Sequence, residues 1–551
     1  MLSWSDAFTF ATYSLAVPLA GVATGTVVLA GWLSYLKVVS LSDTLKKLPG
    51  NHLGSFQQAD VDTEEWAREH ANGRRDRTPL NLRLPGLYPF EGRLRLLTLD
   101  PRIIAYILNS SNFEKPAESR AFLTKLLGKG MFAAEGREHK AMRKAFAPAF
   151  AKSVLRVIEP VMLQKAEQVR SSCVSRLPPT ICCWQLCDIW SREAKDGAVD
   201  VQSWLHRASL DVMTALGFGE DVNAVADKQD SIYAAYRSML RLIEYGTNAF
   251  NLYLSLKISW FHTVFPDVLS RTFDAAHHSI LTSGRSLLHL DASPKLFEKD
   301  EEVSTPSLLH AIIRDSMRTN KTADAQLFGV LSTLLFNGAD SVGSTTAWAL
   351  HHLSLNQNYQ HRLRAELAEI RNDTDRVKVL ESLPLLSNLI RETLRLSPPL
   401  AATIRVACRD EVLHAGEDIV LSDGSLVREI FVKKGTLVHI PIEPVNTLTD
   451  FWGADAKVFN PDRWNNLPET AKALPGIHQT MAFLFGPHSC PGSNIALAEM
   501  RIFIAAIVQH FELHVAADIG RMNALMLRPY VRTKWLAEGV QLPLALIPIS
   551  A

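Results

Sequence analysis

The sequence predicts a mainly helical α+β fold, with one large domain behind an N-terminal membrane-spanning helix. Apolar residues recur three and four positions apart over many stretches, which is typical of helices with one buried face. Strand-like runs are short and few, and they do not alternate regularly with helices as in a chain of βαβ units. We expect a membrane anchor in residues 1–40 and a single domain in residues 41–551.

The composition is that of an ordinary globular protein. Of 551 residues, 47% are hydrophobic and 21% are charged, and the formal net charge is +1. No run of five or six like charges is present, so nucleic acid is not expected as a partner. Six cysteines are too few for a disulfide scaffold in a chain of this length.

The N-terminal segment 7–36 contains no charged residue and no histidine. A transmembrane helix needs only about 20 apolar residues, so this segment is long enough to cross a bilayer. A cleaved signal peptide is the alternative, but only Asp6 carries a side-chain charge before the segment. Lys37, Lys46 and Lys47 follow it, and this positive charge places the remainder of the chain on the cytosolic side.

The periodicity predicts the elements of the body in order. Helices are expected over 140–154, 211–217, 231–245, 307–317, 325–355, 360–370, 385–396 and 493–511. Strands are expected over 93–99, 419–421, 430–432, 438–441 and 542–549. Asp423 and Gly424 lie between two of these strands and predict a hairpin turn.

The strongest motif contains Cys490 and leads into the last predicted helix. Phe483, Gly486 and Gly492 surround the cysteine, and the two glycines permit a tight loop whose backbone approaches a bulky planar group. Pro491 marks a possible helix start, which would lower the pKa of the thiol. A lone cysteine is usually a small buried hydrophobe, but this loop favours a thiolate ligand to iron.

Two further patterns carry acidic residues on predicted helices. Glu392 and Arg395 share one helix face, and they would need another partner such as Arg463 to form a buried cluster rather than an exposed pair. Asp340 and Ser341 follow Gly338 in the longest helical stretch. A glycine and an acid on an apolar helix predict a locally opened helix that admits a small ligand or water and handles protons.

The last pattern is His139 and Arg143, one helical turn apart after Gly136. Taken alone, a basic helix face explains this pair better than a binding site.

Together and in this order, the four patterns resemble the cytochrome P-450 family of haem-thiolate monooxygenases, and most of all its membrane-bound fungal members. The resemblance runs from about Pro49 to the C-terminus and implies a helical haem-binding domain with small antiparallel sheets. It implies that Cys490 ligates the iron of haem b, that Phe483, Gly486 and Gly492 shape its loop, and that Glu392, Arg395 and Arg463 form the structural triad. It further implies that Asp340 and Ser341 are the distal acid–alcohol pair and that the haem propionates are held by His139, Arg143, Arg405 and His488.

The chain departs from the family pattern at several of these positions. Ser341 stands where threonine is usual, and Asn337 stands where alanine is usual. His139 replaces the usual tryptophan and His488 the commoner arginine, which weakens the propionate assignments. Residues 173–198 look like an insertion without a recognisable function.

The resemblance implies insertion of one oxygen atom from O₂ into a hydrophobic small molecule, such as a terpenoid, polyketide or other secondary metabolite. No nucleotide-binding loop is recognisable, so electrons from NADPH should arrive through a separate NADPH–cytochrome P-450 reductase, with the enzyme in contact with lipid at the endoplasmic reticulum membrane. The apolar segments 113–132 and 245–265 would line the substrate pocket. A peroxide isomerase or dehydratase of the same fold, and a non-catalytic haem-binding membrane protein, are the alternatives.

Overall fold

Most of the predicted domain can be described in the computed structural model. The structure describes residues 50–52, 80–85, 92–151, 154–155, 159, 162, 190, 198–218, 222, 224–225, 231–244, 268–287, 328–329, 331–333, 335–370, 376–421, 423–524, 526–534 and 538–549. The predicted anchor at 7–36, most of the insertion at 173–198, the predicted helix at 307–317 and the pocket segment at 245–265 lie outside these residues. Among the described residues, no helix has both the length and the apolar character needed to cross a bilayer.

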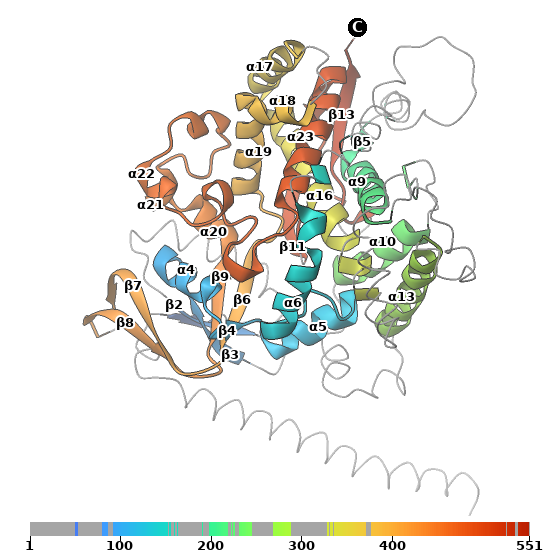
Figure 1. Ribbon diagram of the computed structural model, residues 1–551. Coiled ribbons are helices and arrows are strands. Elements are labelled where there is room, and N and C mark those ends of the chain that lie inside the picture. The colour runs from blue at the N-terminus through green and yellow to red at the C-terminus, as the bar shows by residue number, and fades with distance from the viewer. Residues whose placement is uncertain are drawn as a thin grey trace, which may run out of the picture.

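Helices form the bulk of the described fold, as the sequence predicts (Figure 1). The α-helices are α4 (Pro101–Asn109), α5 (Ala117–Leu127), α6 (Gly136–Phe146), α9 (Val201–Phe218), α10 (Ser231–Glu244), α13 (Val268–Leu287), α16 (Ser341–Leu355), α17 (Gln357–Ala368), α18 (Arg376–Ser382), α19 (Pro384–Leu396), α20 (Ile442–Thr447), α21 (Thr449–Trp452), α22 (Glu469–Lys472) and α23 (Ser493–His510). Short 3₁₀ turns lie at Ala147–Phe150, Pro461–Asn465, Ile477–Gln479 and Gly486–His488, and a π-helical segment spans Leu335–Asp340.

The strands form small sheets at the edges of this helical body. The largest sheet has the order β1-β2-β3-β9-β6-β4, and the others pair β10-β13-β5, β11-β12 and β7-β8. Their bounds are β1 (Gly50–His52), β2 (Leu80–Pro85), β3 (Gly92–Leu97), β4 (Phe113–Glu114), β5 (Val199–Asp200), β6 (Ala402–Ala407), β7 (Glu411–Val420), β8 (Leu426–Val432), β9 (Leu437–Pro441), β10 (Phe511–Val515), β11 (Ile519–Ala524), β12 (Met526–Val531) and β13 (Pro543–Pro548). The predicted hairpin is confirmed, because Gly424 adopts φ +81° between β7 and β8.

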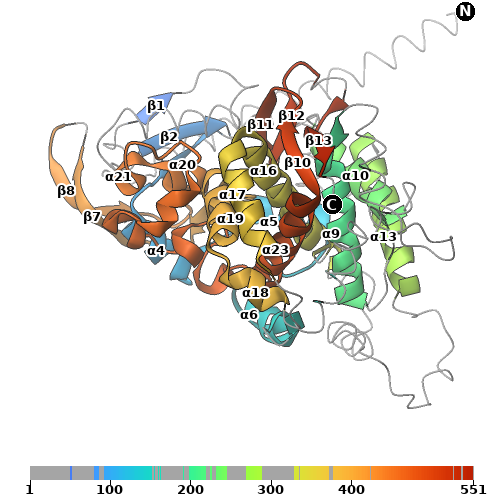
Figure 2. The same cartoon turned by 90° about the horizontal axis from the view of Figure 1, so that it is seen from above.

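The two views place the β7–β8 hairpin and the α10–α13 pair at opposite ends of the molecule, with α16 between them (Figures 1 and 2). Almost every residue of α16 is buried, which agrees with a sequence that contains no Asp, Glu, Lys or Arg on any side of the helix. It packs against α9, α19 and α23. The helix that carries the predicted distal residues is therefore the centre of the fold.

Candidate functional site

The loop before α23 presents Cys490 in a tightly closed turn. The backbone N–H of Cys490 donates to the carbonyl of Phe483 at 2.8 Å, and that of Ser489 donates to the carbonyl of Gly486 at 3.0 Å. Gly486 has φ +71°, and a Cβ atom there would lie 2.7 Å from the carbonyl oxygen of Leu108. Glycine is therefore required at this position for both conformation and space.

The other features of this loop differ in part from the sequence prediction. Helix α23 begins at Ser493, as the periodicity predicts, with Gly492 as its N-cap, and Pro491 lies in the turn before it. A Cβ on Gly492 would meet only the Phe150 ring, at 3.6 Å, so space does not require this glycine. Burial raises the pKa of the Cys490 thiol, and the hydrogen bond from the Gly492 backbone and the charge of Arg143 only oppose this effect. The backbone at Gly492 and the charge of Arg143 thus act in the predicted direction, but burial outweighs them.

A cluster of charged and aromatic side chains lies beside the cysteine loop. The Lys115 ammonium is 2.6 Å from Oε1 of Glu135, and Nε2 of His488 is 2.9 Å from Oε2 of the same carboxylate. The rings of His139 and His488 lie 4.1 Å apart with an interplanar angle of 31°. The structure brings the predicted residues His139 and His488 together in this cluster with Lys115 and Glu135, which the sequence did not predict.

Burial and charge together set the protonation of this cluster. Burial alone would raise the pKa of Glu135, but hydrogen bonds from His488 and Lys115 lower it to about 2. Burial, the charge of His488 and that of Lys115 lower the pKa of His139 to about 4. At neutral pH, Glu135 is a carboxylate and His139 is a neutral ring.

Arg143 and Arg405 face different partners. Arg143 Nη1 donates to the carbonyl oxygen of Ser489 at 2.8 Å, so it supports the cysteine loop directly. Arg405 is only 2% exposed, and Nη1 donates to the Thr403 hydroxyl at 2.7 Å and the Ile404 carbonyl at 2.8 Å. Within the described part of the chain, no carboxylate forms an ion pair with Arg405. A buried guanidinium with only neutral acceptors is suited to bind an added anion.

The predicted triad is a fully buried ion cluster. Glu392 Oε1 accepts from Arg395 Nη2 at 2.8 Å and from Arg463 Nε at 3.0 Å, and Oε2 accepts from Arg395 Nε at 2.9 Å. Two partners were not predicted: Trp464 Nε1 donates to Glu392 at 3.0 Å, and Asp455 lies 2.9 Å from Arg463. The exposed-pair alternative for Glu392 and Arg395 is therefore wrong.

The distal residues lie where the helix opens. The π-helical segment Leu335–Asp340 precedes α16, which confirms the opening that Gly338 and Asp340 predicted. Ser341 Oγ donates to the carbonyl of Asn337 at 2.5 Å, so its hydroxyl is hydrogen-bonded to the backbone of the preceding turn. The pair is adjacent in sequence, but the two side chains have separate partners.

Asp340 forms a bidentate ion pair that the sequence did not predict. Arg528, in β12, donates to its two oxygens at 2.9 and 2.6 Å, and His206 Nε2 is 3.3 Å from Oδ1. Burial alone would raise the pKa of Asp340, but Arg528 and His206 lower it. Asp340 is therefore a carboxylate with both oxygens engaged, 188 residues from its arginine in the sequence.

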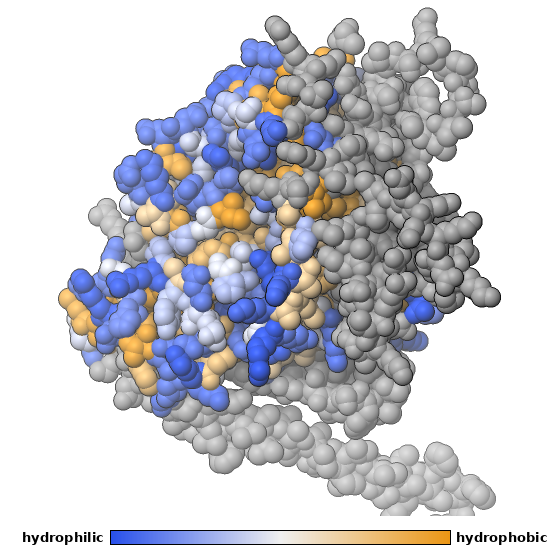
Figure 3. Space-filling model, in the orientation of Figure 1, coloured by the Kyte–Doolittle hydropathy of each residue, from blue (hydrophilic) through white to orange (hydrophobic). Residues whose placement is uncertain are grey.

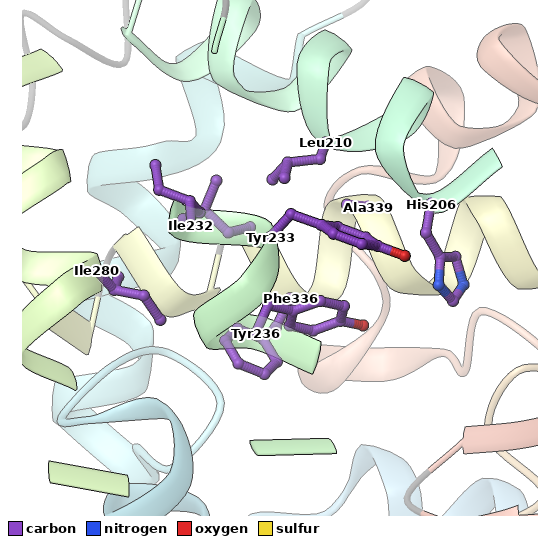
Figure 4. Close-up of a pocket in the computed structure, with 9 residues that line it drawn as sticks. His206, Leu210, Ile232, Tyr233, Tyr236, Ile280, Phe336 and Ala339 are labelled. Carbon is purple, nitrogen blue, oxygen red and sulfur yellow. The ribbon is translucent and has the colours of Figure 1, made fainter. Parts of the chain in front are cut away.

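A small and mainly apolar cavity adjoins this ion pair on the α9–α10 side (Figure 4). His206 lies at one end, and Tyr236 packs edge-on against Phe336 at 4.5 Å between ring centres. Burial raises the pKa of Tyr236 well above its ordinary value, so the phenol is neutral.

Comparison with known proteins agrees with these observations. The sequence model described as Cytochrome P450 matches residues 92–530, which include every predicted site residue. The chain belongs to the cytochrome P450 family. It is thus an oxygen-dependent monooxygenase that uses haem and receives electrons from a redox partner.

Its curated relatives are fungal cytochromes P450. The chain is 31% identical to cytochrome P450 monooxygenase 128 of Postia placenta over 82% of its own length and 83% of that protein. It is 30% identical to cytochrome P450 monooxygenase 205 of the same fungus, with 83% and 84% covered. It is also 25% identical to cytochrome P450 monooxygenase claW of Ampulloclitocybe clavipes, with 93% and 94% covered.

Proposed function

We propose that this cytochrome P450 inserts one oxygen atom from O₂ into a hydrophobic secondary metabolite, such as a terpenoid or polyketide. We propose that its prosthetic group is haem b and that its electrons come from NADPH through a separate reductase. The observation that carries this proposal is the closed loop that presents Cys490, and the buried guanidinium of Arg405, which has only neutral acceptors, supports it. A thiolate and a cation for a propionate are the two contacts that such a haem needs.

The residues that are present fit this group. Cys490 would be its axial ligand, Arg405 would bind a propionate, and buried Phe483 would pack near it. Thiolate-ligated haem, when bound, supplies oxygen activation and transfer to a C–H bond. The protein would contribute the closed ligand loop, the buried guanidinium of Arg405 and the opened helical segment Leu335–Asp340.

Asp340 and Ser341 would handle protons in this mechanism. The carboxylate of Asp340 is held by Arg528, so it must shift from that guanidinium before it can accept a proton from water. Burial lowers the pKa of His206 to about 4, so at neutral pH this ring is neutral and is not the proton source. Ser341 must likewise turn its hydroxyl away from the Asn337 carbonyl to donate to a bound molecule. Both side chains are thus held in a resting arrangement from which proton transfer requires a local rearrangement.

The proposed substrate pocket and reductase surface involve residues 113–132 and α6. Segment 113–132 contributes buried Phe113, Leu126 and Leu127, in keeping with an apolar substrate. Lys140 and Lys144 are exposed on α6, where hydrophilic residues cover the surface in Figure 3, and they would attract an acidic reductase.

We propose that residues 7–36 anchor the enzyme in the endoplasmic reticulum membrane with the catalytic domain in the cytosol. Removal of residues 1–40 should move the protein from the membrane fraction to the soluble fraction with its haem retained. The check is fractionation followed by haem absorbance. Firm membrane binding of the truncated protein would show that another surface is the anchor.

The haem assignment is tested by Cys490→Ser. The variant should lose the red-shifted absorption band of the reduced carbon monoxide complex, because a hydroxyl is a poor substitute for a thiolate donor. An unchanged band would reject Cys490 as ligand. The substrate class is tested by measuring product formation and NADPH consumption with a reductase and a panel of terpenoids and polyketides. A lack of turnover on all of these compounds would reject the proposed substrate class.

A further inference from the structure

Glu135 joins three segments that are far apart in the chain. Its Oε1 atom accepts from the Lys115 ammonium at 2.6 Å and from the Lys115 backbone N–H at 3.1 Å. Its Oε2 atom lies 2.9 Å from Nε2 of His488, two residues before Cys490. The Glu135 side chain is 4% exposed, so these contacts are shielded from water.

Lys115 and His488 are also in contact with each other. The Lys115 ammonium lies 3.4 Å from Nδ1 of His488 and 3.4 Å from the carbonyl oxygen of Ala134. The His488 ring therefore lies between the two partners, with Nε2 facing the Glu135 carboxylate and Nδ1 facing the Lys115 ammonium.

A second contact fastens the next residue of the same loop. Arg143 donates to the carbonyl oxygen of Ser489, and the His139 ring packs on His488. Residues 488 and 489 are thus both attached to the region of α6, immediately before Cys490. His139 and Arg143, which the resemblance places at the haem propionates, are thus also in contact with the ligand loop.

We propose that Glu135 is a positioning residue that fastens the Cys490 loop to the segment before α6 through His488, with Lys115 as its second anchor. This inference rests on the proposed role of Cys490 as haem ligand. The carboxylate would act by limiting how far the cysteine moves from the iron. Loss of the fastening should let the loop relax, so that the thiolate ligation fails more often although the thiol is still present.

The test is the lifetime of thiolate ligation in the reduced carbon monoxide complex of the full-length protein. The red-shifted band of Glu135→Gln should decay to the unshifted form roughly 10–100-fold faster than in wild type, since a hydrogen bond to a charged group is worth about 1.5–3 kcal/mol. Glu138→Gln is the matched control, because Glu138 is an exposed carboxylate three residues further along the chain. It should decay at the wild-type rate, and Glu135→Asp should recover part of the stability.

Two further variants separate positioning from general destabilisation. Leu380→Ala removes a 1% exposed side chain in α18 and should lower the melting temperature without accelerating the decay. The proposal is overturned if Leu380→Ala accelerates the decay as much as Glu135→Gln does when both variants lower the melting temperature by the same amount. The proposal also fails if Glu135→Gln decays at the wild-type rate.

A double variant tests the route through His488. Glu135→Gln combined with His488→Gln should accelerate decay by less than the product of the two single effects, because both changes break the Glu135–His488 contact. Multiplied effects would overturn the route through His488. If Glu135→Gln accumulates without haem, Lys115→Met replaces it in the same assay, because this variant keeps the Glu135–His488 contact. Lys115→Met should accelerate decay of the red-shifted band. Decay at the wild-type rate would overturn the role of Lys115. Cys490→Ser, by contrast, should show no red-shifted band in any background, so failure of the ligand assignment is recognised separately.

Discussion

At the residue scale, the sequence predicted the site residues that belong to a recognisable local motif or helical spacing. Cys490 stands among glycines at fixed spacing, and Glu392 and Arg395 lie one helical turn apart. Glu135 and Arg528 were missed, because their partners lie 353 and 188 residues away and no local pattern links them. Such contacts depend on tertiary packing, which brings single charges together without any periodic signal.

The buried pair of Asp340 and Arg528 gives the first prediction at this scale. Arg528→Met should lower the free energy of unfolding by about 3–5 kcal/mol, because it leaves an unpaired carboxylate in the interior. Asp340→Asn combined with Arg528→Met should recover much of this loss, since no lone charge remains. Denaturant unfolding of the three proteins is the measurement. A loss below about 1 kcal/mol in Arg528→Met would show that water or another group can replace the guanidinium.

Glu499 in α23 predicts a pH dependence of stability. Burial raises its pKa to about 8 against the opposing hydrogen bond from Ser209, which donates to Oε1 at 2.6 Å. The folded protein thus keeps a proton that the unfolded chain releases near pH 4.5. Below pH 4.5 the buried Glu499 contributes its full amount to the free energy of unfolding. This contribution falls by about 1.4 kcal/mol per pH unit as the pH rises from 4.5 to about 8.

Replacement of Glu499 by glutamine should remove this slope. Unfolding measured from pH 5 to pH 8 should show a flatter stability profile in Glu499→Gln than in wild type, with the largest gain near pH 8. Glu138→Gln, which changes an exposed carboxylate, should keep the wild-type slope. Parallel profiles in Glu499→Gln and wild type would mean that Glu499 is ionised in the folded protein.

At the element scale, helix positions were predicted better than helix boundaries. The apolar face of the stretch ending at Leu355 indicated a buried helix, and Gly338 with Asp340 indicated its opening. The helix predicted over 211–217, by contrast, begins at Val201 and ends at Phe218. Boundaries depend on loop geometry, which spacing alone does not encode.

The close approach of α16 and α9 gives a prediction at Gly343. A Cβ atom there would lie 3.0 Å from the backbone nitrogen and 3.1 Å from the Cα of His206, so the two helices would have to separate. Gly343→Ala should cost about 1–3 kcal/mol of stability despite the better helix propensity of alanine. Gly338→Ala is the matched comparison, because its Cβ would meet mainly the flexible end of Met213. Thermal unfolding should rank Gly343→Ala as the less stable variant, and the reverse order would contradict the packing argument.

At the scale of the whole molecule, the sequence predicted the mixture of elements but not the arrangement of the strands. The largest sheet pairs Arg95 with Leu437 and Phe113 with Ala407, so its order depends on contacts between distant parts of the chain. The apolar residues form two cores, one among the helices and one around this sheet. Ile390 and Leu394 of α19 belong to the first core, and Trp452 and Trp464 belong to the second.

The Glu392 cluster joins these two cores, and its loss should affect the whole molecule. Glu392→Ala leaves two buried guanidinium groups without their shared carboxylate, at a cost of about 3–5 kcal/mol. That is a large part of a typical stability of about 5–15 kcal/mol, so little haem-bound protein should accumulate.

Asp462→Ala is the control for the Glu392 prediction, because its bidentate pair with Arg362 has the same chemistry at side chains that are both 43% exposed. The control should lose less than about 1 kcal/mol, since water solvates the freed arginine. Yield of haem-bound protein and melting temperature are the measurements. If Glu392→Ala and Asp462→Ala have equal effects, the Glu392 cluster does not hold the two cores together. We expect Glu392→Ala to have the much larger effect, because Glu392 is buried between the two cores.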